Sequence, residues 1–471
     1  MQFASGSSAA SSPRFNVPFR EIRLPTPNRG PSSCFRTTVR SKARRIVQTS
    51  ITNEIHAAEY EFPDEALPTD SGYLPIDESS ESRLFYVYYE ASKPDTELEI
   101  SPIMVWLNGG PGCSSLIGCF YELGPWIVQE NFSLQKNPGA WNRRCGILFV
   151  DNPIGTGFSI ATSELEVPRC QETVALHLHN ALSTFMEQKS FTKRPLVLAG
   201  ESYAGKYLPA LAHHILTRKN GNGLSSQLSG VAIGNGLIHP RTQVQMHAEV
   251  AFCFGLLDKQ QSQYVQELAR EVVELIDRED WLAAHDQRTY LCKWIETTSG
   301  IPTLLDVRRS SRYHRREDGT DYLAEFLNLP HVRTSLKVDP TALNFACCRK
   351  SVKLLMAEDT MKSTKWMLET VLKKGLPVLL YQGVYDAKDG AASSEAWMRS
   401  LNWEYVDRFW KSPREIWKVM GDKAGYWRQG RNLTHVVIAG AGHEVPADQP
   451  VCSRAMIETW MAGLACWKAK L

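Results

Sequence analysis

The chain has 471 residues, of which 43% are hydrophobic and 22% charged, a composition typical of folded globular proteins rather than disordered or fibrous ones. Its 53 basic and 51 acidic residues give a net charge of +2, and no zinc-finger or P-loop spacing occurs, so we expect no nucleic-acid partner. No apolar run approaches the roughly 18 residues of a membrane-spanning helix, so we expect no membrane association.

The N-terminal segment differs from the rest of the chain. Between Met1 and Asn53 it is rich in serine, arginine and proline, and Glu21 is its only acidic residue. It has no apolar core of the kind found in secretory signal peptides. The composition resembles an organelle transit peptide, and a disordered tail or a misplaced start codon explains it equally well. We predict a disordered or targeting segment over residues 1–60 and a folded domain over 61–471.

Short apolar runs alternate with helical patterns from Ser71 onward. Continuous apolar runs, each followed by Gly, Asn or Asp, are typical of strands buried on both faces. They lie at 83–90, 102–107, 146–150, 195–198, 231–233, 377–381 and 435–438. After Ser202, apolar residues recur at helical spacing, which predicts a helix there. A second helix is predicted over 364–374, ending at Gly375. This alternation predicts an α/β protein with a mostly parallel central sheet and helices on both faces.

The interval 239–362 interrupts the alternation. It is rich in charged residues, has apolar residues at helical spacing between Tyr264 and Ile276, and contains few β-type runs. An insertion between two core strands explains both this composition and the length of the chain. We therefore predict a helical lid over about 239–362.

A candidate nucleophile lies between a predicted strand and a predicted helix. The segment 200–205 (GESYAG) contains the G-x-S-x-G pattern, directly after the strand at 195–198. The pattern alone is weak, but the strand–turn–helix context is that of a nucleophile elbow, which exposes the serine hydroxyl. We predict that Ser202 is the nucleophile and that the backbone N–H of Tyr203 donates to the oxyanion.

A serine nucleophile needs a base and an orienting acid. In α/β-hydrolases they follow the serine in the order Asp or Glu, then His. We predict that His443 is the base and Asp386 the orienting acid, because each comes just after a predicted strand, where open α/β sheets build their sites. Asp389 is the competing acid. The second histidine of a zinc-protease helix is missing after His443, so we predict a serine hydrolase that uses no metal or cofactor.

Six segments resemble motifs of the serine carboxypeptidase family, in matching order between about Ser71 and Gly463. They are 106–115 (WLNGGPGCSS), 120–125 (FYELGP), 151–159 (DNPIGTGFS), 200–207 (GESYAGKY), 233–238 (IGNGLI) and 442–446 (GHEVP). The chain looks most like the plant serine carboxypeptidase-like and vitellogenic-like branches. The resemblance implies an α/β-hydrolase fold and removal of the C-terminal residue of peptides and proteins, through an acyl-enzyme on Ser202 and with an acidic pH optimum.

The resemblance also implies roles for other residues. Gly110 and Tyr203 would hold the oxyanion through their backbone N–H groups. The C-terminal carboxylate of the substrate would be bound by Trp106, Asn108, Gly109, Glu122 and Glu201. Two glutamates facing a carboxylate would repel it unless they share protons, and crowding and burial raise such pKa values.

The cysteines and sequons bear on the compartment. Eleven dispersed cysteines fit either buried thiols or disulfides, and the sequons at Asn131 and Asn432 weakly favour the secretory route. The resemblance implies a vacuolar, lysosomal or secreted enzyme and a disulfide from Cys113 to Cys347 or Cys348.

Two other functions remain as alternatives. Some relatives are acyltransferases that use the same triad to move acyl groups from sugar esters to alcohols. Those enzymes typically have Asp before the nucleophile, where this chain has Glu201. A catalytically silent binding scaffold is the other alternative, and the joint presence of the triad, oxyanion and carboxylate-binding residues argues against it.

Overall fold

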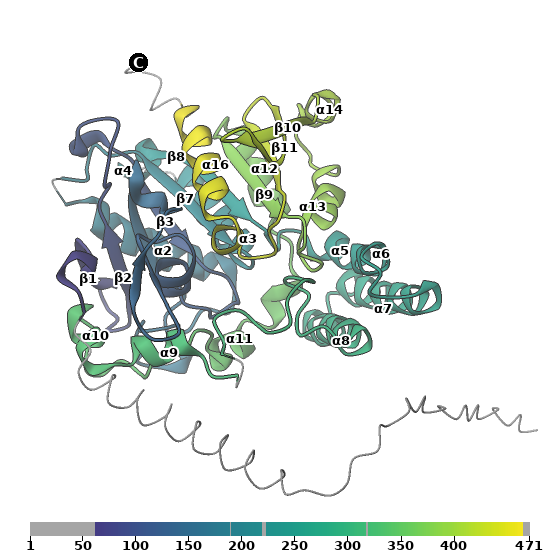
Figure 1. Ribbon diagram of the computed structural model, residues 1–471, viewed down its shortest axis with the longest axis horizontal. Coiled ribbons are helices and arrows are strands. Elements are labelled where there is room, and N and C mark those ends of the chain that lie inside the picture. Colours follow the sequence, from purple (N-terminus) through teal and green to yellow (C-terminus); the bar gives the residue numbers. More distant parts are fainter. Residues whose placement is uncertain (1–61, 189, 219–222, 317–318, 465–471) are drawn as a thin grey trace, which may run out of the picture. The chain divides into compact units, whose positions relative to one another are not determined.

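The computed structural model describes residues 62–464 apart from 189, 219–222 and 317–318, so the segment predicted over 1–60 lies outside the described residues. Ten strands form one sheet in the order β1-β2-β6-β3-β7-β8-β9-β12-β11-β10 (Figure 1). The neighbours from β6 to β12 pair in parallel, whereas β1, β2, β11 and β10 join antiparallel at the two edges. The predicted mostly parallel sheet is thereby confirmed.

All seven runs predicted as strands lie in this sheet, and its edge strands β1, β10 and β11 were not predicted. The strands are β1 (Asp70–Pro75), β2 (Arg83–Tyr89), β3 (Ile103–Leu107), β6 (Gly146–Val150), β7 (Leu196–Glu201), β8 (Leu228–Gly234), β9 (Val378–Gly383), β10 (Glu415–Val419), β11 (Asp422–Gly430) and β12 (Leu433–Ile438). A separate pair consists of β4 (Trp126–Val128) and β5 (Leu134–Lys136).

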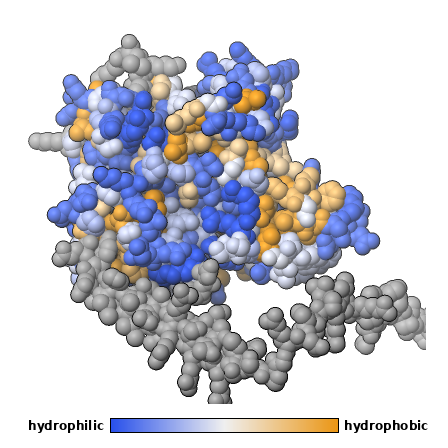
Figure 2. Space-filling model, viewed as in Figure 1, coloured by the Kyte–Doolittle hydropathy of each residue, from blue (hydrophilic) through white to orange (hydrophobic). Residues whose placement is uncertain are grey.

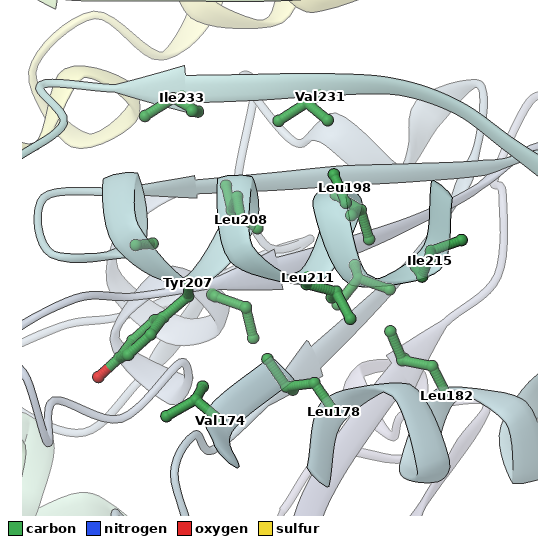
Figure 3. Close-up of a cluster of buried hydrophobic side chains, with 14 of the residues drawn as sticks. Val174, Leu178, Leu182, Leu198, Tyr207, Leu208, Leu211, Ile215, Val231 and Ile233 are labelled. Carbon is green, nitrogen blue, oxygen red and sulfur yellow. The ribbon is translucent and has the colours of Figure 1, made fainter. Parts of the chain in front are cut away.

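Helices cover both faces of the sheet, in keeping with the burial of β3, β6, β7, β9 and β12 at every position. On one face, leucines of α2 and α3 pack together beneath Leu198 of β7 and Val231 of β8 (Figure 3). This face carries α2 (Gln171–Met186), α3 (Ala204–Thr217), α4 (Gly223–Gln227), α12 (Lys365–Lys373), α13 (Ala391–Met398) and α14 (Val406–Lys411). The opposite core includes Trp106 and Tyr381 and is covered by α9 (Tyr322–Leu327), α15 (Val445–Asp448) and α16 (Pro450–Ala462).

The connection from β8 to β9 contains the interval predicted as a lid. Its described part holds helices and no named strand between 239 and 362. Besides α9, these are α5 (Pro240–Gln243), α6 (His247–Cys253), α7 (Lys259–Asp277), α8 (Trp281–Ser299), α10 (Pro330–Ser335) and α11 (Lys350–Leu355). Helices α6, α7 and α8 share an apolar cluster of their own, around Val265, Leu268 and Leu291, and α7 and α8 extend beyond the sheet edge (Figure 1).

Short turns of 3-10 or π type complete the chain. They are η1 (Asp64–Ala66), η2 (Leu98–Ile100), η3 (Gly118–Glu122), η4 (Trp141–Arg143), η5 (Glu164–Glu166), η6 (Val244–Met246) and η7 (Glu358–Met361). Hydrophobic residues on the face shown in Figure 2 gather over the region of α5 and α6, beside largely hydrophilic surface. Within the described residues, none of the helices combines the length and apolar character needed to cross a bilayer.

Candidate active site

Ser202 occupies the tight turn between β7 and α3. Its φ is +61°, an uncommon conformation for a residue with a side chain, and its N–H donates to the Gly234 carbonyl at 2.9 Å. Glycine is required on both sides of the turn. A Cβ on Gly200 would lie 2.3 Å from the carbonyl oxygen of Leu107, and one on Gly205 would lie 2.9 Å from the Cα of Gly236. These close approaches explain why the chain folds here as the predicted elbow.

His443 and Asp386 contact each other directly. His443 Nδ1 lies 2.5 Å from Asp386 Oδ2, and both side chains are buried. The other carboxylate oxygen, Oδ1, accepts from the backbone N–H groups of Lys388 at 2.8 Å and Asp389 at 3.0 Å. The carboxylate is therefore fixed in the orientation that faces the imidazole.

The competing acid, Asp389, has different partners. Its Oδ1 accepts from Gln243 of α5 at 3.3 Å and lies 3.4 Å from an Arg288 nitrogen on α8. Asp389 therefore connects the loop after β9 to the inserted helices α5 and α8. The acid that contacts His443 is Asp386.

Asn235, which the sequence reasoning did not single out, connects the loop after β9, which carries Asp386, to the loop after β12, which carries His443. Its Nδ2 donates to the carbonyls of Gly442 at 3.0 Å and His443 at 2.5 Å, and its Oδ1 accepts from the N–H of Gly383 at 3.0 Å. The preceding residue, Gly234, accepts the Ser202 N–H. The signal for Asn235 was its place in the 233–238 motif, directly after a strand.

The inserted chain also supports the site, through backbone groups. The Leu305 carbonyl accepts from the N–H of His443 at 2.9 Å, and the Leu304 carbonyl accepts from Ala387 at 2.9 Å. The segment therefore hydrogen-bonds both to the loop that carries His443 and to the loop that carries Asp386. Carbonyl oxygens leave no signature in the sequence, so this support could not be predicted.

The turn after β3 lies against the elbow. A Cβ on Gly109 would lie 2.3 Å from the backbone nitrogen of Tyr203 and 2.8 Å from Cβ of Ser202, and Gly110 has φ of +109°. The Tyr203 hydroxyl donates to Asp359 Oδ2 at 2.6 Å, which anchors the residue whose N–H is the predicted oxyanion donor. The predicted donors, Gly110 and Tyr203, thus belong to two turns that approach closely.

Replacing Gly109 with alanine should lower kcat/KM by about 100-fold or more, because the added methyl displaces an oxyanion donor. The added Cβ would lie 2.3 Å from the nitrogen of Tyr203. Steady-state kinetics of the purified variant measure the loss, and Gly223→Ala is the control because its Cβ would meet nothing closer than 3.8 Å. Equal activity of the two variants would contradict the close approach of the turns.

Asn108 bridges the two predicted glutamates. Its Nδ2 donates to Glu122 Oε1 at 2.9 Å and to Glu201 Oε1 at 3.1 Å. Its Oδ1 accepts from Trp106 Nε1 at 2.7 Å and from the Gly118 N–H at 3.1 Å, which fixes the orientation of the amide. The predicted carboxylate-binding residues therefore meet beside Ser202, and Trp106 acts on the cluster by orienting Asn108.

Both glutamates are buried. Burial raises the pKa of Glu122 to about 7. Burial, and then the nearby Glu122 carboxylate, raises the pKa of Glu201 well above its ordinary value. Among the described residues, no lysine or arginine makes an ion pair with either glutamate. The pair therefore favours protonated carboxyl groups, which can donate hydrogen bonds.

Glu444, next to His443, is a third acid that the site prediction omitted. It is buried, and burial followed by the charge of Glu122 raises its pKa well above the ordinary value. Its place in the 442–446 motif was the available signal. The site thus collects three glutamates whose ionisation is mutually unfavourable.

A disulfide ties the site to the end of the insertion. Cys113, four residues after Gly109, bonds to Cys348, and Cys347 is a buried free thiol. Of the two pairings left open by the sequence, the structure contains Cys113–Cys348.

Comparison with known proteins gives the family. The sequence model of the serine carboxypeptidase family matches residues 60–463. The chain belongs to the serine carboxypeptidase family. Serine carboxypeptidase-like 50 from Arabidopsis thaliana is 45% identical over 87% of this chain and 91% of its own length. The human probable serine carboxypeptidase CPVL is 31% identical over 85% of each chain.

A solved structure supports the fold of this serine carboxypeptidase. Kex1(delta)p, a prohormone-processing carboxypeptidase from Saccharomyces cerevisiae, superposes with a TM-score of 0.75 at 23% identity, covering 86% of this chain and 96% of the yeast chain. The predicted α/β-hydrolase fold is confirmed, as is the prediction of a serine-type carboxypeptidase.

Proposed function

We propose that Ser202, His443 and Asp386 form the catalytic triad that hydrolyses the last peptide bond of peptides and proteins. The observation that carries this substrate class is the pair of buried glutamates bridged by Asn108, beside the elbow and without a cationic partner among the described residues. A protonated acid pair binds a carboxylate, and only the end of a polypeptide places a main-chain carboxylate one residue from the cleaved bond.

Acylation would proceed by a proton relay. Ser202 Oγ attacks the carbonyl carbon while its proton passes to His443, whose Nδ1 is oriented by Asp386. The N–H groups of Gly110 and Tyr203 stabilise the negative oxygen of the tetrahedral intermediate. The intermediate collapses when the imidazolium gives its proton to the departing amine, which releases the C-terminal amino acid.

Deacylation would repeat the relay with water. His443 accepts a proton from water as the hydroxyl adds to the ester carbonyl of acylated Ser202. Collapse of the second intermediate breaks the bond to Oγ, which recovers its proton from His443. The enzyme then releases a peptide that is one residue shorter.

Peptide binding should weaken as the pH rises through about 7, where burial places the pKa of Glu122. The sign follows from the charge, because the raised pKa keeps the pair protonated below that pH and ionisation above it repels the substrate carboxylate. Profiles of KM against pH should show the rise for an N-blocked dipeptide and much less of it for an N-blocked amino-acid ethyl ester, which lacks a free carboxylate. The same alkaline limb in both profiles would rule out this role.

Replacing Glu122 with glutamine tests the substrate class. We expect KM for an N-blocked dipeptide to rise by about 10-fold or more, with little effect on the ethyl ester, because the short O–H···O⁻ bond from the protonated carboxyl group is replaced by a longer and weaker N–H···O⁻ bond from the amide. Glu369→Gln is the control, since Glu369 is also buried but bonds to Lys365 on α12. Amidation of the dipeptide should impair binding to the wild-type enzyme and have less effect on E122Q. If the dipeptide and its amide are cleaved equally well, the proposal fails.

We propose a catalytic domain over 61–471 with a lid over about 239–362, preceded by a targeting or disordered segment over 1–60. We also propose that the protein passes through the secretory pathway to a vacuole-like compartment or the exterior.

If the protein is glycosylated, Asn131 is the expected site because it is exposed, whereas Asn432 Nδ2 already donates to the carbonyls of Leu372 and Leu376. Glycopeptide mass spectrometry before and after glycosidase treatment checks this, and a glycan on Asn432 would contradict it.

A further inference from the structure

Three metal-ligating side chains meet in the inserted chain, outside the catalytic residues. His314 lies in the loop before α9, Asp321 caps the start of α9, and Cys347 precedes the cysteine of the disulfide. One ligand atom from each residue lies within 4.8 Å of the other two. The group combines an imidazole, a carboxylate and a thiol, and it is the only group of this kind found among the described residues.

Hydrogen bonding does not account for the whole cluster. Nδ1 of His314 is buried and makes no hydrogen bond to any described residue, and Asp321 Oδ1 lies 3.3 Å away. That same oxygen accepts from the Ala324 N–H at 3.1 Å and from the Cys347 thiol at 3.4 Å. The histidine and the thiol therefore converge on one carboxylate oxygen.

Two of the three spacings match those of a tetrahedral zinc site, and the ligand nitrogen and sulfur lie within 4.8 Å of each other. With bonds of about 2.0 Å to oxygen and nitrogen and about 2.3 Å to sulfur, tetrahedral angles separate nitrogen from oxygen by about 3.3 Å and sulfur from oxygen by about 3.5 Å. The corresponding distances here are 3.3 Å and 3.4 Å. We propose that His314, Asp321 and Cys347 bind one zinc-type divalent cation, with the fourth position left to water.

The chemistry of the three donors selects the metal. Thiolate and imidazole favour zinc over calcium and magnesium, which prefer oxygen donors. On binding, the sulfur–metal bond forms as the thiol releases its proton to the buffer. A thiolate and a carboxylate then neutralise the two positive charges of the cation.

The backbone already holds the ligands close together. Arg315 and Asp321 form an isolated antiparallel bridge, and the N–H of Arg316 donates to the Thr320 carbonyl at 2.9 Å. His314 has φ of +43°, so its placement is maintained at some conformational cost. A bound cation would link this loop to Cys347, next to the disulfide that reaches the turn after β3.

The loop also adjoins the substrate side of the enzyme. The ring of His314 packs edge-on against Tyr121, with 5.5 Å between ring centroids, and Tyr121 directly precedes Glu122. Metal binding would therefore fix a loop beside the carboxylate-binding residues. The metal site is independent of the proposed catalytic steps, so either proposal can fail alone.

Direct metal binding provides the test. The full-length protein is stripped with a chelator, and Zn²⁺ binding is measured by competition with a chromophoric chelator. We expect one tight equivalent for the wild type and a loss of affinity of about 10-fold or more in both Cys347→Ser and His314→Asn, since each removes a ligand. Asparagine is chosen at 314 because it tolerates positive φ. His285→Asn is the matched control, because His285 also lies beside an aspartate, 3.0 Å from Asp286, but outside the cluster.

Two further readouts separate binding from loss of structure. Co²⁺ should give a sulfur-to-metal charge-transfer band with the wild type and with H285N, and no such band with C347S. Circular dichroism and thermal unfolding of the metal-free variants establish that they are folded. The proposal is overturned if the wild type binds no stoichiometric Zn²⁺, if both ligand variants keep its affinity, or if peptide mapping finds Cys347 in a disulfide.

Discussion

Replacing Ser202 with alanine should reduce kcat for release of the C-terminal amino acid by about 10⁴- to 10⁶-fold, with KM for the peptide little changed. The alanine variant lacks the hydroxyl that we propose forms the acyl-enzyme, whereas Asn108, Glu122 and Glu201 are untouched. The measurement is amino-acid release from an N-blocked dipeptide near pH 5. Ser226→Ala is the control, because Ser226 is exposed and its hydroxyl only donates to the Gly223 carbonyl, at 2.8 Å.

The Ser202→Ala substitution should remove the hydroxyl group without disturbing the turn. Alanine has the same Cβ as serine, so the turn at φ of +61° and the hydrogen bond to Gly234 can be retained in the variant. A loss of activity with unchanged thermal unfolding would therefore reflect the missing hydroxyl. Activity within 10-fold of the wild type would mean that another group attacks the substrate.

Replacing Asp386 with asparagine should lower kcat by about 10⁴-fold, because the amide can present an N–H group to the imidazole and favour the wrong tautomer. His443 Nδ1 lies 2.5 Å from the Asp386 carboxylate, so the substitution acts on the base directly. Asp389→Asn is the matched control, because the Asp389 side chain bonds to Gln243 and Arg288 instead. We expect D389N to keep kcat within about 10-fold, since its backbone N–H still donates to Asp386.

The ranking of the two variants is the informative outcome. A larger loss of kcat in D389N than in D386N would reassign the acid.

The central sheet could be predicted because its strands are apolar on both faces. The run Gly146–Val150, for example, is buried at all five positions and was predicted within the same limits. The edge strands were missed for the opposite reason. β10 (Glu415–Val419) is exposed at three of its five positions and includes Glu415 and Lys418, so its sequence carries little of the apolar signal of a core strand.

The site could be predicted as a set of residues following strands, because parallel strands end at one edge of the sheet. The choice between Asp386 and Asp389 could not be made from position, since both follow β9 within six residues. Tertiary contacts distinguish the two residues, because Arg288 and Gln243 approach Asp389 and His443 approaches Asp386. The contacts made by the carbonyls of Leu304 and Leu305 could not be predicted from the sequence at all, because every residue has the same backbone carbonyl whatever its side chain.

Covalent labelling with a serine-reactive phosphonate, followed by peptide mapping, tests the nucleophile and the substrate class together. One label per chain is expected on Ser202, with loss of peptidase activity, little labelling of His443→Ala, and protection by an N-blocked dipeptide but not by its C-terminal amide. Labelling at another residue, or full peptidase activity in the labelled enzyme, would contradict Ser202 as the nucleophile. Equal protection by the acid and the amide would contradict recognition of the free carboxylate.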